Sequence, residues 1–135
     1  MEEKNNNSFF TSWLALIVIV IGTFMAVLDG SIVNVALPKI MNVFGASTDD
    51  AKWIITAYTL AEGAIIPLTG YLEEVVGSKK VYIFALTTFT IGSLLCGLSW
   101  NINSMIAFRT FQAIGGGMII PVGMTIVYSI FPNNK

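Results

Sequence analysis

Four long apolar segments constrain the fold of this 135-residue chain more than any other feature. We expect each to be a membrane-spanning helix, because about 20 apolar residues at 1.5 Å each cross a hydrocarbon core about 30 Å thick. Spanning strands are excluded, since they alternate apolar and polar residues. Short connections predict antiparallel neighbours in two helical hairpins. The sequence therefore predicts an all-α integral membrane protein with four transmembrane helices, at about residues 13–37, 53–72, 81–100 and 105–131.

The composition excludes most other classes of protein. Only 11% of the residues are charged, whereas soluble domains have about 25%. The net charge of −1 gives no clustered basic face for nucleic acid. The chain has no histidine and a single cysteine, which argues against disulfides and metal sites. We also find no nucleophile–base pair, so we expect neither an enzyme nor a bound cofactor.

The lysines predict the orientation in the membrane. Cytoplasmic segments of membrane proteins carry an excess of lysine and arginine. With residues 1–12 as a cytoplasmic tail and 13–135 as the transmembrane domain, four lysines fall inside and two outside. We therefore expect a multi-pass protein of the cell membrane with a cytoplasmic amino terminus. The inner lysines are Lys4, Lys79, Lys80 and Lys135, and the outer ones are Lys39 and Lys52.

Three charged residues, Asp29, Glu62 and Arg109, lie inside separate apolar segments. A charge at bilayer depth costs about 2.5–3.5 kcal/mol on the insertion scale, so such residues generally have a function. At 1.5 Å per residue, Asp29 and Glu62 lie about 12 and 13 Å below the outer membrane face, and Arg109 about 7 Å below it. Because arginine is long enough to span this offset, the three charges are expected to form one site.

One guanidinium neutralises only one of the two carboxylates. The acid nearer Arg109 is expected to stay ionised, and the other to carry a proton or contact a cationic substrate. The alternative is a structural ion pair beside an acid that faces a water-filled crevice. Glu62 shares a helical stripe with Tyr58, and this stripe faces either a cavity or another helix.

The segment Leu28–Pro38 reads L-D-G-S-I-V-N-V-A-L-P. It resembles the first-helix signature of the drug:proton antiporters of the major facilitator superfamily, in the branch with fourteen spanning helices. The resemblance implies that Asp29 is the membrane-embedded acid of proton coupling or cation recognition. We also expect Asn34, Tyr58 and Gln112 to line the cavity.

The segment from Gly70 to Lys80 reads G-Y-L-E-E-V-V-G-S-K-K. It resembles the superfamily's loop between helices two and three, with Glu74 in place of an aspartate. The resemblance implies that this loop stabilises the outward-facing state. Its expected functional residues are Gly70, Glu74, Gly77, Lys79 and Lys80.

The segment Arg109–Gly117 reads R-T-F-Q-A-I-G-G-G. It resembles the superfamily's fourth-helix motif, which is associated with proton transfer. Arg109, Gln112 and Gly116 recur at i, i+3 and i+7 and so share one helix face. For the three glycines we favour a packing role, because small residues allow helices to approach closely.

These observations predict proton-coupled efflux of lipophilic cationic drugs by the amino-terminal four helices of a longer transporter. The expected partners are the lipid bilayer, a small amphipathic substrate, protons and the remaining carboxy-terminal helices, with no nucleic acid. The proton gradient supplies the energy. Two alternatives stay open, namely a small four-helix membrane protein that works as an oligomer and a non-functional remnant of a longer gene.

Overall fold

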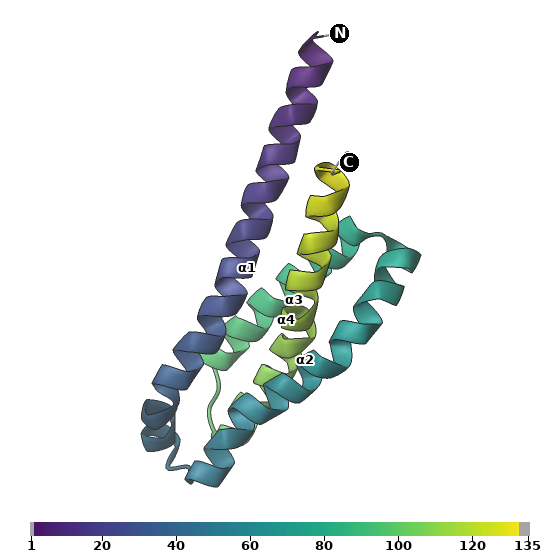
Figure 1. The fold of residues 1–135 in the computed structure, drawn as a ribbon. Coiled ribbons are helices and arrows are strands. Elements are labelled where there is room, and N and C mark those ends of the chain that lie inside the picture. Colours follow the sequence, from purple (N-terminus) through teal and green to yellow (C-terminus); the bar gives the residue numbers. More distant parts are fainter. Residues whose placement is uncertain (1, 133–135) are drawn as a thin grey trace.

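The computed structural model describes residues 2–132, with side chains from residue 6 onward, and this range forms four helices (Figure 1). The helices are α1 (Glu2–Phe44), α2 (Thr48–Val76), α3 (Ser78–Gly97) and α4 (Ile102–Ile130). Within the described part, α1, α3 and α4 are long and apolar enough to cross a membrane. The all-helical prediction is confirmed. The side chain of Lys4 and all of Lys135 lie outside the described residues.

The helices extend beyond the apolar runs that predicted them. The segment expected to be a tail is helical from Glu2, and α1 is about 65 Å long for its 43 residues. At the start of α2, the side chain of Ser47 accepts a hydrogen bond from the Asp50 backbone at 3.1 Å. Asn101 caps α4 through the Ser104 backbone at 2.7 Å. Ser47 and Asn101 lie outside the apolar segments. The helices therefore begin earlier than predicted, and the connections before them are shorter.

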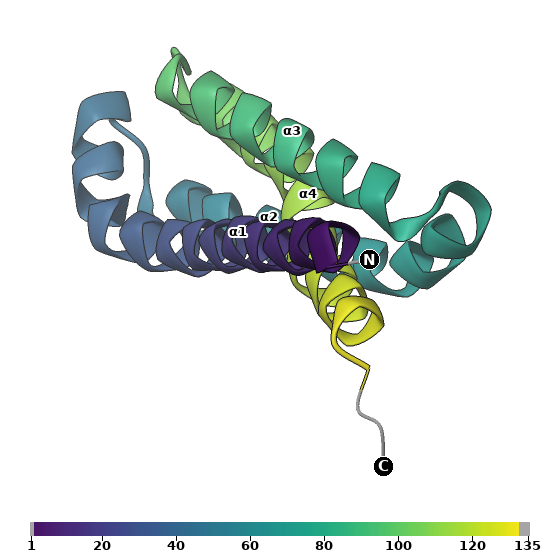
Figure 2. The ribbon, with the colours of Figure 1, turned by 90° about the horizontal axis from the view of Figure 1, so that it is seen from above.

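Helix α4 is the centre of the packing. It contacts α3 and α2 extensively and α1 to a lesser degree, whereas the consecutive helices α1 and α2 share few contacts. Figure 2 shows α4 running beside α3 and crossing the other two helices. The first of the two predicted hairpins is therefore an open one, because α2 packs on α4 rather than closely on α1.

Two apolar clusters stabilise this arrangement. One joins α1, α3 and α4 around Ile19, Phe89 and Ile119, and the other joins α1, α2 and α4 around Val33, Ile54 and Met105. Asp29 and Arg109 lie between members of these two clusters along α1 and α4. The charged residues are thus bounded by apolar packing on both sides.

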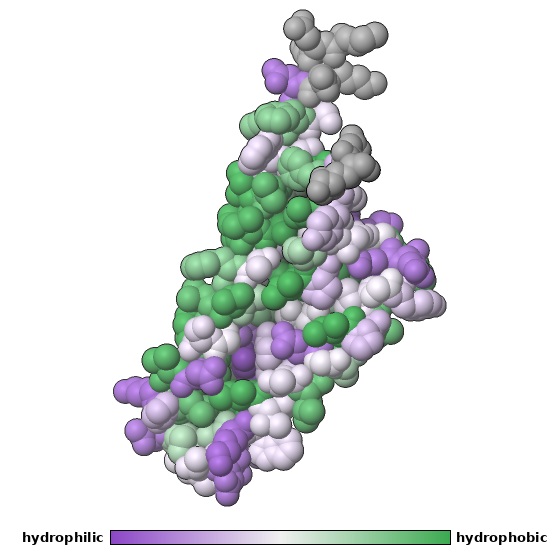
Figure 3. Space-filling view, viewed as in Figure 1, coloured by the Kyte–Doolittle hydropathy of each residue, from purple (hydrophilic) through white to green (hydrophobic). Residues whose placement is uncertain are grey.

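Polar and apolar residues separate along the length of the molecule. Both termini and the α2–α3 turn lie at one end of the molecule, and the other two connections lie at the opposite end (Figure 1). Apolar side chains cover the length of α1 between these ends, while hydrophilic residues gather at the ends and in one interior band (Figure 3). The molecule therefore has two polar ends and one polar level between them.

Three helices contain a proline in their interior, namely Pro38 in α1, Pro67 in α2 and Pro121 in α4. Proline has no backbone N–H and cannot donate to the carbonyl four residues earlier. The carbonyls of Gly63 and Gly117 therefore lose their usual partners within α2 and α4. The end of α1 turns away from the helix axis beyond its own proline (Figure 2).

Candidate functional site

Asp29 on α1 is bound by two side chains of α4. Arg109 donates from Nη1 to Asp29 Oδ2 at 2.6 Å, and Gln112 donates from Nε2 to Asp29 Oδ1 at 3.2 Å. The same Nη1 also donates to Gln112 Oε1 at 2.7 Å. These three residues, which we call the Asp29 cluster, form a closed ring of hydrogen bonds. The shared face of Arg109 and Gln112 follows from their spacing of three residues.

The Asp29 cluster is shielded from its surroundings. The side chain of Arg109 is 3% exposed and that of Asp29 is 17% exposed. An ion pair at this depth depends on good geometry, because both charges have lost their hydration. Removing one partner leaves the other charge buried and uncompensated, at a cost of about 3–5 kcal/mol. Asp29 is therefore the acid that pairs with Arg109 in this conformation.

Helix α2 contributes Tyr58 to the same place. The Cζ atom of Arg109 lies 4.0 Å from the centroid of the Tyr58 ring, a cation–π contact. The Tyr58 hydroxyl lies against Gly116, which has no side chain to obstruct it. Three helices thus meet around one guanidinium.

Glu62 lies one helical turn beyond Tyr58 and is half-buried. Its backbone lies against α4, because a Cβ added to Gly117 would be 3.3 Å from Glu62 Cα. Its carboxylate has no hydrogen bond or ion pair with any side chain that the structure describes. The structure therefore places Glu62 beside the Asp29 cluster without joining it.

Asn34 is not part of this cluster. It is exposed, and its Nδ2 donates to the Gly30 carbonyl of its own helix at 2.8 Å. Five residues separate Asn34 from Asp29, which turns it about 140° around the helix. Of the three expected cavity residues, Tyr58 and Gln112 thus lie beside Asp29 and Asn34 does not.

Gly92 on α3 is a supporting residue that sequence reasoning missed. A Cβ on Gly92 would lie 2.6 Å from the Cβ of Gln112, so α3 packs directly behind that side chain. A glycine inside an apolar helix costs stability unless a neighbour approaches closely. The sequence shows a glycine within an apolar segment, but it does not show that Gln112 is the neighbour that approaches it.

The turn between α2 and α3 consists of Gly77, whose φ of +92° favours glycine. Its N–H donates to the Glu73 carbonyl at 2.9 Å, and Ser78 Oγ donates to Glu73 Oε1 at 3.0 Å. The acid that contacts the turn is thus Glu73, whereas Glu74 is exposed. Three other residues of the expected loop motif are also exposed, namely Gly70, Lys79 and Lys80.

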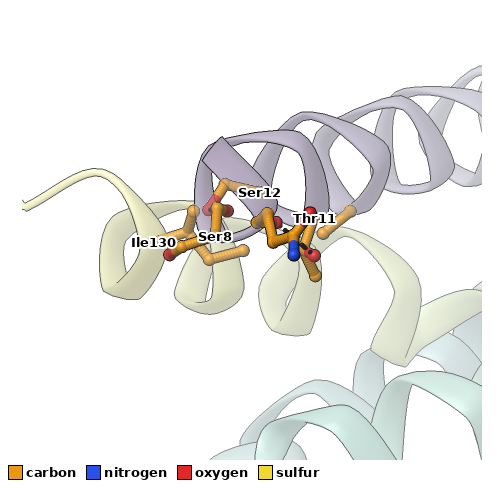
Figure 4. Close-up of a pocket in the computed structure, with 6 residues that line it drawn as sticks. Ser8, Thr11, Ser12 and Ile130 are labelled. Carbon is orange, nitrogen blue, oxygen red and sulfur yellow. Dashed lines mark hydrogen bonds between the residues drawn. The ribbon is translucent and has the colours of Figure 1, made fainter. Parts of the chain in front are cut away.

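A hollow of about 370 Å³ lies between the start of α1 and the end of α4. Ser8, Thr11, Ser12 and Ile130 line it (Figure 4). Thr11 donates its hydroxyl to the Asn7 carbonyl at 2.8 Å, and Ser12 to the Ser8 carbonyl at 3.0 Å. The hydroxyls of Thr11 and Ser12 are therefore used within α1.

Comparison with known proteins agrees with the three motifs. Residues 19–135 match the family model of the Major Facilitator Superfamily. The riboflavin transporter RibZ of Clostridioides difficile is 42% identical over 123 residues, which cover 91% of this chain and 27% of RibZ. The probable multidrug resistance protein EmrY of Escherichia coli is 37% identical over 125 residues, which cover 93% of this chain and 24% of EmrY.

The multidrug export protein EmrB of Escherichia coli is 38% identical over 115 residues, which cover 85% of this chain and 22% of EmrB. The chain therefore spans about a quarter of the length of these relatives. The family match extends over most of the chain and includes the Asp29 cluster. The chain belongs to the Major Facilitator Superfamily of membrane transporters, as its motifs predicted.

Proposed function

We propose that the chain forms the amino-terminal four helices of a proton-coupled antiporter that exports lipophilic cationic compounds across the cell membrane. The observation that carries this proposal is the buried Asp29–Arg109 pair, which joins α1 to α4 within the apolar bundle. The similarity to EmrY, a probable multidrug resistance protein, and to EmrB, a multidrug export protein, supports the substrate class.

The proposed coupling acts through the charge of Asp29. When ionised, its two carboxylate oxygens accept hydrogen bonds from Arg109 and Gln112 and tie α1 to α4. A proton on the carboxyl removes the charge and weakens this tie, because charge-assisted hydrogen bonds are about twice as strong as neutral ones. Proton binding would thereby change the preferred arrangement of the two helices, which is what alternating access requires.

We further propose that the amino terminus is cytoplasmic. The α2–α3 turn, which Lys79 and Lys80 follow, lies at the same end of the molecule as the start of α1, and the α1–α2 connection, flanked by Lys39 and Lys52, lies at the other end (Figure 1). This distribution follows the positive-inside rule. Single cysteines introduced at positions 79 and 52 of a cysteine-free variant test it: a membrane-impermeant maleimide added to intact cells should label only the cysteine at position 52.

The test of function uses the full-length transporter in inverted membrane vesicles, with ethidium as the lipophilic cation. Asp29→Asn should abolish ethidium transport that depends on the proton gradient, since the side chain keeps its shape but no longer titrates. Asp49→Asn is the matched control, because it makes the same change at an acid with a 94% exposed side chain, and it should transport normally. Unchanged ethidium transport by Asp29→Asn would overturn the assignment of Asp29.

Riboflavin transport is a second candidate, favoured by the 42% identity to RibZ. Riboflavin carries no positive charge, so its recognition would not need an unpaired acid such as Glu62. Radiolabelled riboflavin in the same vesicles distinguishes the two candidates. Transport of riboflavin without transport of ethidium would replace the proposed substrate class.

A further inference from the structure

We infer that Glu62 is a second carboxylate partner of Arg109 and that the guanidinium alternates between Asp29 on α1 and Glu62 on α2. Glu62 is thus a positioning residue that receives Arg109 whenever Asp29 releases it. The pairing itself does not depend on what is transported. Its part in the transport cycle rests on the proposed function.

The first observation is the unused side of Arg109. Both described hydrogen bonds of its guanidinium come from Nη1, toward Asp29 and Gln112. Its Nε is buried and has no hydrogen-bond partner within the described part of the chain. Buried polar groups are normally satisfied, so an orphan donor on a 3% exposed side chain requires an explanation.

The geometry of the guanidinium shows what kind of partner fits. Arginine presents its N–H groups as a planar fork that binds a carboxylate through two parallel hydrogen bonds. The pair with Asp29 occupies the Nη1 side alone. The Nε side remains available for a second carboxylate.

The second observation is that Glu62 supplies such a carboxylate. It has no partner among the described side chains and lies one turn beyond Tyr58, whose ring already contacts the guanidinium. Side chains in a helix generally lean toward its amino terminus, which for Glu62 is the direction of Tyr58. The charged groups that act on Glu62 electrostatically are Arg109 from α4 and Asp29 from α1.

The packing of α2 on α4 holds Glu62 close to α4. The backbone of Glu62 already contacts Gly117, and the Tyr58 ring forms a flat surface beside the guanidinium. A proton on Asp29 would release Arg109, which would then bind Glu62. A cationic substrate would compete for Glu62 and return Arg109 to Asp29, which favours release of the proton.

A double-mutant cycle on the purified full-length transporter tests the pairing, with the melting temperature in detergent as the readout. In the native background, Glu62→Gln should leave Tm unchanged or raise it slightly, because Glu62 is unpaired and repels Asp29. In the Asp29→Ala background, Arg109 should pair with Glu62. Glu62→Gln should then lower Tm by about 3 °C or more, because partners in one charge network are not additive.

The control is Glu74→Gln, an exposed acid on the same helix, which should shift Tm equally in both backgrounds. Equal shifts for Glu62→Gln in the two backgrounds would overturn the inference. Asp29→Asn gives a second background of nearly native shape if Asp29→Ala does not fold. Because the measurement uses neither substrate nor gradient, failure of ethidium transport in vesicles bears on the proposed function and not on this pairing.

Discussion

Gly115 of α4 lies directly against the backbone of Phe89 in α3, so that a Cβ on Gly115 would be 2.6 Å from the Phe89 amide nitrogen. The neighbouring glycines face α2 instead, Gly116 toward Tyr58 and Gly117 toward Glu62. Consecutive glycines thus allow α4 to approach two helices at one level. The close approach of α2 brings the Tyr58 ring against Arg109.

Gly115→Ala should destabilise the protein by about 1–3 kcal/mol, because the added methyl group cannot be accommodated without moving α3. The measurement is thermal unfolding of the purified full-length transporter. Gly63→Ala is the control, since no atom of the described residues lies within 4 Å of its added Cβ. Equal melting temperatures for the two variants would contradict the packing role of Gly115.

Gln112→Leu should cost about 1.5–3 kcal/mol, the range for hydrogen bonds to charged groups, because Asp29 and Arg109 each lose a partner. It should also reduce proton-driven ethidium transport. Thr110→Val is the comparison on the same helix, since the Thr110 hydroxyl donates only to the Ile106 carbonyl, at 2.9 Å. A Gln112→Leu variant as stable as Thr110→Val would show that the ring of hydrogen bonds contributes little.

Tyr58→Phe should retain stability and transport, because the cation–π contact with Arg109 depends on the ring and not on the hydroxyl. Tyr58→Leu removes the ring and should lose about 0.5–2 kcal/mol. Thermal unfolding and ethidium transport of the two variants provide the measurement. Loss of activity in Tyr58→Phe would instead assign the role to the hydroxyl beside Gly116.

Ser78→Ala should loosen the turn between α2 and α3, because it removes the hydrogen bond to Glu73. A side-chain bond of this kind contributes about 0.5–1.5 kcal/mol. Hydrogen–deuterium exchange of the peptide that contains Gly77 should become faster in Ser78→Ala and in Glu73→Ala. The exposed Glu74 provides the control, and faster exchange in Glu74→Gln would restore it as the acid that stabilises this turn.

The sequence predicted the meeting of Asp29 and Arg109 because depth follows from counting residues along a helix. It also placed Gln112 on the Arg109 face through their spacing. It did not show that Asn34 lies away from the Asp29 cluster, since membership of a motif does not state which side of the helix a residue occupies. That distinction needed the packing of α1 on α4, which brings Asp29 toward Arg109 and leaves Asn34 exposed.

The pairing of helices was harder to predict than their existence. Short connections favour consecutive hairpins, yet α2 packs on α4 rather than closely on α1. The three glycines Gly115–Gly117 allow two helices to approach α4 closely, but the sequence does not show which helices these are. The helix ends were missed for another reason. Ser47 and Asn101 are polar capping residues, and hydropathy does not detect them.

The prolines of α2 and α4 weaken the two helices at the same level, which forms a plane across the molecule. Pro67 and Pro121 leave the carbonyls of Gly63 and Gly117 without their helical donors, and Gly117 lies against the backbone of Glu62, next to Gly63. Both helices therefore bend most easily at this level. The Asp29 cluster lies on one side of this plane and Gly77 on the other. Bending at this level would move the α2–α3 turn while the Asp29–Arg109 ion pair stays intact.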